Sequence, residues 1–362
     1  MRVLITNGRL DRPSGTEVYV RDLAIELTER GHEVEVYSPE VGAIGVTLRE
    51  RGVNVASNIL DLRQEPEIIH AHHFLPAMDA ILRFAETPAI FFVHDRLGLN
   101  DVPPRHSRVV RYVAVDHNCI DRLLIDNLIP AGETEIVYNW VDTDVFKLRS
   151  NIANQPTRAL VFSNYAAEDN HFRVIKAACE EQGIELDGIG FALGRSEMDP
   201  ATILGNYDIV FAKAKAAMEA LATGAHVVVC DYRGLAGSVT RENFDHFRKF
   251  NFGMRTLTRP IEHAALVEEI RRYDPNEIRV VAERIRAEAR FDDTVDRLVD
   301  LYGETIECYE RDGPRPAQFD RQTVRLHFVL KNSGADQTES ILRGIEQANT
   351  HPEAVTYLPF FA

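Results

Sequence analysis

Strand-like apolar runs alternate with helix-like patterns from the first residues of the chain. Residues 2–6 form a continuous apolar run, and apolar positions recur at helical spacing in residues 16–30, where Gly31 closes the predicted helix. Further strand-like runs lie at residues 32–37, 67–72, 89–95, 109–116 and 134–139. Strands that alternate with crossover helices predict βαβ units and a parallel sheet.

The alternation stops at a polar stretch without periodicity, residues 147–158, and then begins again. The second set of predicted strands covers residues 159–163, 184–192, 207–212 and 227–231, and residues 260–303 read as several consecutive helices. We therefore predict an α/β fold class with two facing doubly wound, Rossmann-like domains, residues 1–146 and 159–311, joined by a linker at 147–158. Ligands of such sheets bind at the carboxyl ends of the strands, so we expect a site in the cleft between the domains.

A turn-forming run at residues 312–316 (DGPRP) ends the second domain and begins a tail, residues 312–362. Within this tail, residues 323–330 are strand-like and residues 338–348 have a short helical pattern. The pattern assigns no role to the tail.

The chain is acidic, because its 362 residues include 41 Lys and Arg against 56 Asp and Glu, a net charge of −15. This balance argues against sequence-independent nucleic-acid binding, which depends on neutralising phosphates. The four cysteines lack metal-site spacing and read as reduced thiols of a cytoplasmic protein. We expect no signal peptide and no membrane span. A local basic group, Arg105, Arg108 and Arg111, could give a peripheral contact with anionic lipid, although a solvated face is the favoured interpretation.

Two strand ends carry histidines. His94 and Asp95 follow a buried strand, where such a pair can bind a hydroxyl or a phosphate, or exchange protons; the structural alternative is a capping aspartate beside a histidine satisfied by the backbone. His70, His72 and His73 suggest a metal, but strand alternation sends His70 and His72 to one face and His73 to the other. Without a further ligand at a suitable spacing, we predict no metal site.

Residues 207–231 are the most informative segment. A buried strand ends near Lys213, a helix begins between Lys213 and Lys215, Glu219 lies in its first turns, and Gly224 ends it. Lysines beside a helix N-terminus suit a diphosphate, and a glutamate one turn further can accept hydrogen bonds from a ribose diol. The alternative is that the lysines are solvated and Glu219 is an ordinary surface residue.

Taken together, these features resemble the retaining family 4 glycosyltransferases of the GT-B fold. The resemblance follows the order of elements in residues 1–303. It rests on residues 29–34 (ERGHEV), 69–72 (IHAH), 93–95 (VHD), 136–146 (IVYNWVDTDVF) and 219–224 (EALATG), with the glycine loop before the first helix.

The resemblance implies transfer of a sugar, with retention of configuration, from a nucleotide-sugar donor to a hydroxyl of a glycan, a lipid-linked or a small-molecule acceptor. It implies no divalent metal and no cofactor beyond the nucleotide-sugar co-substrate. Matched by position, Glu219 is similar to the glutamate that binds the donor ribose, and Gly15, with Thr16 after it, to the loop near the diphosphate. His94 is similar to the histidine near the reacting sugar, with Asp95 beside it as the second catalytic candidate.

The same resemblance gives a structural role to Asp142 and Asp144, which have the DxD form of some metal-binding glycosyltransferases but whose setting predicts a turn or a helix cap. A metal role for this pair is therefore disfavoured.

The chain departs from the family pattern at two places. Many members carry a second glutamate where this chain has Phe211, and an Arg/Lys pair where it has Ser163 and Asn164. We therefore hypothesise that Lys213 and Lys215 neutralise the diphosphate while Ser163 and Asn164 donate neutral hydrogen bonds. Two alternatives stay open: another GT-B enzyme such as a nucleotide-sugar epimerase, and a non-catalytic GT-B protein that binds a nucleotide sugar or a glycan.

Overall fold

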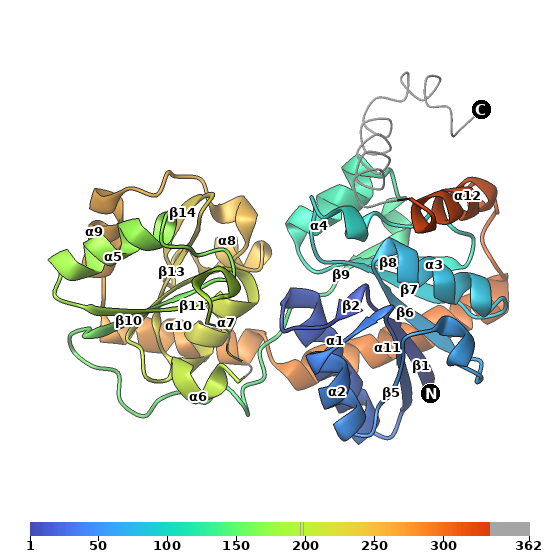
Figure 1. Cartoon of the computed structure of the whole chain (residues 1–362), viewed down its shortest axis with the longest axis horizontal. Helices are drawn as coiled ribbons and strands as arrows, with labels where there is room; N and C mark the ends of the chain where they lie inside the picture. The colour runs from blue at the N-terminus through green and yellow to red at the C-terminus, as the bar shows by residue number, and fades with distance from the viewer. Residues whose placement is uncertain (196, 198, 334–362) are drawn as a thin grey trace, which may run out of the picture. The chain divides into compact units, whose positions relative to one another are not determined.

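The computed structural model describes residues 1–195, 197 and 199–333. Its internal contacts divide the chain into two compact units (Figure 1). Among the described residues, the first unit contains 1–137 and 295–333, and the second contains those within Tyr138–Thr294. Both units are built on a mainly parallel sheet with helices on its faces, so the predicted α/β class with two Rossmann-like units is confirmed.

The first unit contains a seven-stranded sheet in which every neighbouring pair is parallel. Its strands are β1 (Arg2–Thr6), β3 (Glu33–Tyr37), β5 (Asn54–Ala56), β6 (Ile68–His72), β7 (Ala89–Val93), β8 (Val109–Ala114) and β9 (Thr134–Ile136). The spatial order is β5-β3-β1-β6-β7-β8-β9, so the direction of winding reverses between β1 and β6. This reversal is the topological switch point of the unit.

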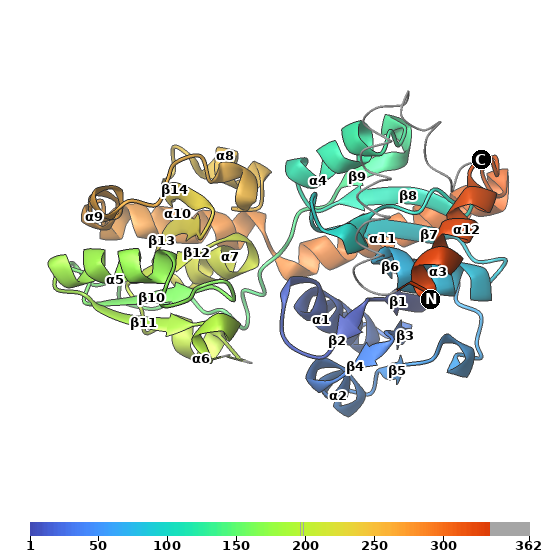
Figure 2. The same ribbon diagram turned by 45° about the horizontal axis from the view of Figure 1, so that its top comes forward.

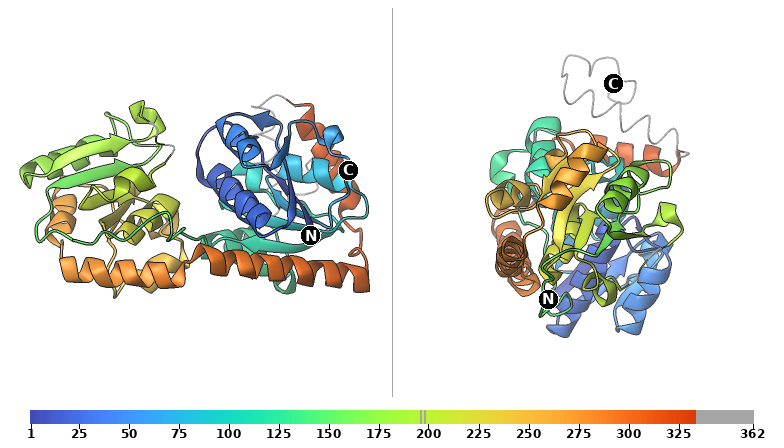
Figure 3. Two further views of the ribbon diagram at one scale, coloured as in Figure 1. Left: turned by 90° about the horizontal axis from the view of Figure 1, so that it is seen from below. Right: turned by 90° about the vertical axis from the view of Figure 1, so that its left-hand side faces the viewer.

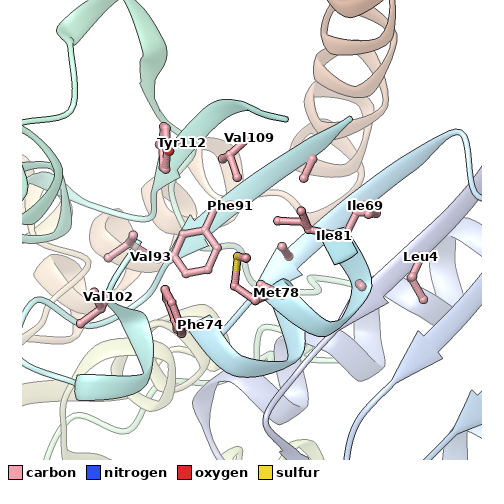
Figure 4. Packing of buried hydrophobic residues seen from close by; sticks show 14 of the residues in the cluster. Leu4, Ile69, Phe74, Met78, Ile81, Phe91, Val93, Val102, Val109 and Tyr112 are labelled. Atoms are coloured by element: carbon pink, nitrogen blue, oxygen red, sulfur yellow. The ribbon is translucent and has the colours of Figure 1, made fainter. Parts of the chain in front are cut away.

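Strand alternation decides what each face of this sheet buries. Ile69, Phe91 and Val93 point to one face and pack with Phe74 and Met78 of α3 (Figure 4). The helices of this unit are α1 (Gly15–Glu29), α2 (Ala43–Glu50), α3 (Phe74–Arg83), α4 (His117–Asp121), most of α11 (Phe291–Asp312) and α12 (Asp320–Lys331); a short pair, β2 (Arg9–Leu10) and β4 (Glu40–Val41), lies outside the sheet. Helix α12 lies beside α3 (Figure 2).

The second unit contains a five-stranded sheet in the order β11-β10-β12-β13-β14. Its strands are β10 (Arg158–Phe162), β11 (Glu185–Ile189), β12 (Ile209–Ala212), β13 (His226–Asp231) and β14 (Gly234–Ser238), of which only β14 is antiparallel to its neighbour. The covering helices are α5 (His171–Glu181), α6 (Ala201–Leu204), α7 (Ala214–Thr223), α8 (Phe244–Lys249), α9 (His263–Arg271) and α10 (Pro275–Glu288). The switch point lies between β10 and β12.

Helix α11 explains why the two units do not follow the predicted boundaries of residues 1–146 and 159–311. Residues 138–146 group with the second unit, and the chain from Val295 onward groups with the first. Leu298, Leu301 and Tyr302 of α11 are fully buried, and Arg297 pairs with Glu135 of β9 at 2.6 Å. Figure 3 shows α11 running along the first sheet. The sequence places this helix after the second sheet but carries no sign of which core it covers.

Of two expectations about the C-terminal region, one was wrong and the other falls outside the described residues. Residues 323–330, expected to be strand-like, lie in helix α12, whose buried Thr323, His327 and Leu330 follow a helical spacing. The predicted helical pattern at residues 338–348 lies outside the described residues. None of the helices that the structure describes is long and apolar enough to cross a membrane.

The arginines at positions 105, 108 and 111 do not form the solvated face that their sequence pattern favours. Arg105 lies 3.8 Å above the ring of Phe319, and Arg108 is only 8% exposed and donates to the carbonyls of Ile81 and Phe84. Arg111 lies 3.6 Å from Glu135. All three guanidinium groups are thus engaged within the first unit.

The core of the first unit predicts a contrast between two phenylalanines. Phe91 is fully buried in β7, whereas Phe328 on α12 is 56% exposed. Phe91→Ala should therefore lower the free energy of unfolding by about 3–5 kcal/mol, and Phe328→Ala should change it by less than about 0.5 kcal/mol. Urea denaturation followed by circular dichroism measures both values, and equal losses would contradict the assigned core.

Candidate functional site

The predicted site residues follow four strands at the carboxyl edges of the two sheets. Gly15 and Thr16 come after β1, and His94 and Asp95 come after β7. In the second unit, Ser163 and Asn164 come directly after β10, and Lys213, Lys215 and Glu219 come directly after β12. The second group therefore flanks the switch point of its sheet, where doubly wound folds bind ligands.

The first side of this switch point is a tight turn after β10. The Ser163 N–H donates to the Ile189 carbonyl at 2.9 Å, and the Asn164 side-chain oxygen accepts from the Phe191 N–H at 3.2 Å. A Cβ on Gly190 would lie 1.8 Å from the Ser163 carbonyl oxygen, so only glycine fits there. The turn leaves the Asn164 side chain exposed at the edge of the sheet.

The second side carries two lysines that are both paired. The Lys213 ammonium forms an ion pair with the fully buried Asp231 and lies 4.9 Å from the centre of the Tyr165 ring. The Lys215 ammonium is 3.8 Å from the carboxylate of Glu219. The lysine side chains are 17% and 19% exposed, so the alternative in which they are solvated charges is wrong.

Helix α7 begins between these lysines. Its N-cap, Lys213, makes no side-chain capping hydrogen bond, and Ala214 has a φ of +53°, a left-handed conformation that is unfavourable for residues other than glycine. The Ala214 N–H donates to the Phe252 carbonyl at 2.9 Å, which holds this conformation. Glu219 is 5% exposed, and Gly224 ends the helix with a φ of +84°. Glu219 is therefore covered, and the alternative in which it is an ordinary surface residue is wrong.

The switch point of the first unit is closed by a contact between its two loops. The Gly8 N–H donates to His73 Nδ1 at 2.9 Å, and a Cβ on Gly8 would lie 2.7 Å from that nitrogen. His73 itself has a φ of +58°, a strained conformation of the kind that clusters at functional sites. His73 follows β6 as the N-cap of α3 and is not part of the strand that carries His70 and His72.

Helix α1 begins beside this switch point with an open first turn. Ser14, its N-cap, makes no capping hydrogen bond to the backbone; instead the hydroxyls of Ser14 and Thr16 donate to Glu17. Gly15 is exposed, and nothing lies within 4 Å of the place where its Cβ would be. Glu17 is 3% exposed and was missed, although the S-x-x-E spacing of a capping box marks it.

His70, His72 and His94 form a hydrogen-bonded chain inside the first unit. The Tyr302 hydroxyl and His70 Nδ1 are 2.5 Å apart, His70 Nε2 and His72 Nε2 are 2.9 Å apart, and His72 Nδ1 and His94 Nε2 are 3.0 Å apart. Tyr19 of α1 packs edge-on against His94, with ring centres 4.7 Å apart. Burial lowers the pKa of His70 and His72 well below the usual value and that of His94 to about 3, so all three rings are neutral at pH 7.

Asp101 fixes the turn that carries His94. One oxygen of its carboxyl group accepts from the backbone N–H groups of His94 at 3.2 Å and Asp95 at 2.6 Å. Burial raises the pKa of Asp101 to about 7, opposed by the positive charge of Arg122 and by these two hydrogen bonds. No signal in the sequence distinguishes this aspartate. Its role arises because the chain turns back, so that Asp101 meets the N–H groups of His94 and Asp95, seven and six residues before it.

The remaining aspartates of interest stabilise turns. Asp95 is exposed, and its carboxylate accepts from the Leu97 N–H at 2.9 Å in an Asx turn. This contact agrees with the alternative interpretation of Asp95 as a capping aspartate. Asp142 accepts from the N–H groups of Asp144 and Val145 at 2.8 and 3.1 Å, so the predicted turn at this pair is confirmed. Within the described residues, no group of three or more His, Cys, Asp or Glu side chains is arranged to hold a metal ion.

The comparisons with known proteins identify the fold. No family model matches the sequence, and no curated protein is significantly similar to it. Among solved structures, a glycosyltransferase from Rickettsia africae matches with a TM-score of 0.62 and 12% identity, covering 84% of this chain and 98% of that one. Anabaena HepE in complex with UDP and glucose matches with a TM-score of 0.59 and 14% identity, covering 84% and 100%.

Sucrose-phosphate synthase from Thermosynechococcus elongatus matches with a TM-score of 0.55 and 12% identity, covering 85% of this chain and 99% of that one. These proteins are glycosyltransferases with the two Rossmann-like domains of the GT-B class. At such low identity the likeness defines the fold, and this chain therefore has the fold of GT-B glycosyltransferases.

Asp101 generates a pH-dependent prediction. Because its pKa is raised in the folded protein, the stability that protonated Asp101 contributes is complete below about pH 4 and is lost as the pH rises through 7. Asp101→Asn keeps an acceptor oxygen but does not ionise. The free energy of unfolding of the variant, relative to the wild type, should therefore rise by up to about 1.4 kcal/mol per pH unit between about pH 4 and 7. Denaturation at several pH values measures this difference, and a constant difference would contradict the assignment.

Proposed function

We propose that the protein is a glycosyltransferase that moves a sugar from a nucleotide-sugar donor to a hydroxyl of a glycan, a lipid-linked or a small-molecule acceptor. The observation that carries the proposal is the second switch point: Ser163 and Asn164 follow β10, Lys213 is the N-cap of α7 after the neighbouring strand β12, and Glu219 lies further along α7. The structural relatives support it, since HepE was solved with UDP and glucose and also with UDP-glucose, and starch synthase IV from Arabidopsis thaliana with ADP.

The donor diphosphate would lie at the N-terminus of α7. There, backbone N–H groups and the helix dipole favour an anion. The Lys213 ammonium is paired with Asp231, and the Lys215 ammonium lies 3.8 Å from Glu219, so both lysines place a positive charge at the start of α7. Ser163 and Asn164 would add neutral hydrogen bonds from the opposite side, and Glu219 would accept from the ribose hydroxyls.

The first unit would hold the acceptor and the reacting sugar. His94 would contact the sugar, with Asp95 in the turn beside it, and the exposed Gly15 and the half-buried Thr16 at the start of α1 would lie against the diphosphate. We propose transfer with retention and without a divalent metal or a further cofactor, in which the leaving diphosphate accepts the proton of the incoming hydroxyl. The chain's own groups would then orient the reactants and stabilise the developing phosphate charge.

Nucleotide binding and release test this proposal. A panel of nucleotide sugars is screened by thermal shift, because a ligand at 100 times its Kd stabilises the native state by about 2.7 kcal/mol. The nucleotide released from the best donor is then measured with and without candidate acceptors. Acceptor-dependent release is expected; a panel in which no nucleotide sugar raises the Tm would overturn the proposal.

Two other results would favour the alternatives. Turnover without an acceptor would indicate an epimerase-like reaction. A proposed UDP-N-acetylglucosamine 2-epimerase from Listeria monocytogenes is among the similar structures, with a TM-score of 0.52 and 11% identity, and gives a reason to test this outcome. Binding without turnover would indicate a nucleotide-sugar-binding protein, in line with Phe211 at the position of the family's second glutamate.

The two lysines of α7 give the sharpest test of the donor site. Removing them should weaken donor binding at least tenfold, about 1.4 kcal/mol, because two cations near the diphosphate are lost. Since Lys213 neutralises buried Asp231, the variant Lys213→Ala/Lys215→Ala is combined with Asp231→Asn and compared with Asp231→Asn alone. Arg173→Ala/Lys176→Ala, on exposed positions of α5, removes the same charge and should leave binding unchanged. Donor affinity is measured by calorimetry. If the variant without the two lysines binds the donor as tightly as Asp231→Asn alone, the lysines do not hold the diphosphate.

Gly15 allows ligand contact to be separated from folding. Gly15→Ala places a methyl group where nothing lies within 4 Å, so the Tm should not fall. If the donor diphosphate approaches this backbone closely, the same methyl group should weaken donor binding by about tenfold or more. Gly303→Ala in α11, which also meets nothing within 4 Å, is the matched control and should bind normally. Normal binding by Gly15→Ala would remove Gly15 from the site.

A further inference from the structure

The hydrogen bonds that join the imidazoles of His70, His72 and His94 can all run in one of two directions, and the protein can select which one. Two hydrogen bonds join ring nitrogens of these neutral histidines, His70 to His72 at 2.9 Å and His72 to His94 at 3.0 Å. In each, one ring donates its single N–H proton and the other ring accepts it. Because a neutral imidazole has one donor and one acceptor nitrogen, the choice at one end fixes every ring along the chain. One end is Tyr302 on α11 and the other is His94 after β7.

Tyr302 fixes the choice. Its hydroxyl is fully buried, and within residues 1–195, 197 and 199–333 its one hydrogen-bond partner is His70 Nδ1, at 2.5 Å. Burial raises the pKa of Tyr302, so the hydroxyl keeps its proton. A buried O–H without an acceptor is costly, and the hydroxyl therefore donates to His70 Nδ1.

The remaining protons follow. With Nδ1 of His70 accepting, its Nε2 carries the proton and donates to His72 Nε2. The proton of His72 is then on Nδ1, which donates to His94 Nε2. His94 is left with its proton on Nδ1, and no described residue hydrogen-bonds to that atom.

We infer that Tyr302, His70 and His72 are positioning residues that hold His94 in the Nδ1–H tautomer, so that it presents a neutral hydrogen-bond donor at the carboxyl edge of the first sheet. This tautomer is the less populated one in free histidine, so the protein has to select it. The inference rests on the proposed function for the ligand that His94 meets: in a sugar transfer, its N–H would bind an oxygen atom of the substrate. His94 would not act as the base that deprotonates the incoming hydroxyl.

The surroundings of the chain support a fixed arrangement. His70 stacks on Phe92 with ring centres 3.9 Å apart, and Tyr19 covers both His72 and His94. Asp101 holds the backbone of His94 through its N–H group. The rings therefore have little freedom to rotate and to exchange their partners.

Nitrogen-15 NMR of protein labelled at histidine tests the tautomer directly, because protonated and unprotonated ring nitrogens have well-separated shifts. The His94 signals are assigned with His94→Gln. The wild type at pH 7.5, without any ligand, should show a protonated Nδ1 and an unprotonated Nε2 on His94. The opposite pattern would overturn the inference, whether or not any variant folds.

Tyr302→Phe removes the hydroxyl and keeps the ring. It should shift His94 to a mixture of tautomers or to the Nε2–H form, whereas Tyr112→Phe should leave His94 unchanged. Tyr112 is the matched control because it too is buried and loses one hydrogen bond, to the Pro104 carbonyl at 2.8 Å. An unchanged His94 tautomer in Tyr302→Phe would contradict the role of Tyr302.

Once a donor and an acceptor are found, kinetics test the consequence. Tyr302→Phe should lower kcat about tenfold with little change in the KM of the donor, and Tyr112→Phe should do neither. An altered tautomer with unchanged kcat would overturn the link to the reaction. The NMR result requires no substrate, so a failure to find any transfer would count against the proposed function and not against the tautomer.

Discussion

The hydrogen bond between Tyr302 and His70 joins residues that are 232 positions apart and completes the polar interior of the first unit. Three histidines buried without partners would be unfavourable, because each ring has one nitrogen that must donate and one that must accept. Helix α11 supplies the Tyr302 hydroxyl, which begins this series of hydrogen bonds. It can do so because the polypeptide returns from the second unit to the first after Thr294. The packing of α11 and the state of His94 are therefore coupled.

Charge pairing has a comparable role in the second unit. An acidic protein with a net charge of −15 needs local groups to hold a diphosphate. Lys213 and Lys215 lie at the start of α7, but Asp231 and Glu219 neutralise them in part. Bare positive charge alone would therefore not hold the donor. In the proposed site, the N-terminus of α7, whose N-cap makes no side-chain capping hydrogen bond, would add the favourable end of the helix dipole to these charges.

The sequence predicted those parts of the molecule that depend on local pattern. Apolar periodicity gave most of the strands and the helices that cross between them, and the alternation of His70 and His72 in one strand placed both on one face. Contacts set by the fold were not predictable. Tyr302 meets His70 across 232 positions, and Asp101 binds N–H groups six and seven residues away only because the chain turns back after β7. The arginines at 105, 108 and 111 contact carbonyls, rings and carboxylates that no local pattern reveals. Residues 323–330 were mistaken for a strand because a short amphipathic segment fits both periods.

A crystal structure with a bound nucleotide sugar shows whether the second switch point binds the donor diphosphate. The ligand is the nucleotide sugar that gives the largest thermal shift. We expect electron density for the diphosphate at the N-terminus of α7, within hydrogen-bond distance of Lys213 or Lys215, and for the ribose against Glu219. Density for the nucleotide elsewhere, with this helix end empty, would contradict it.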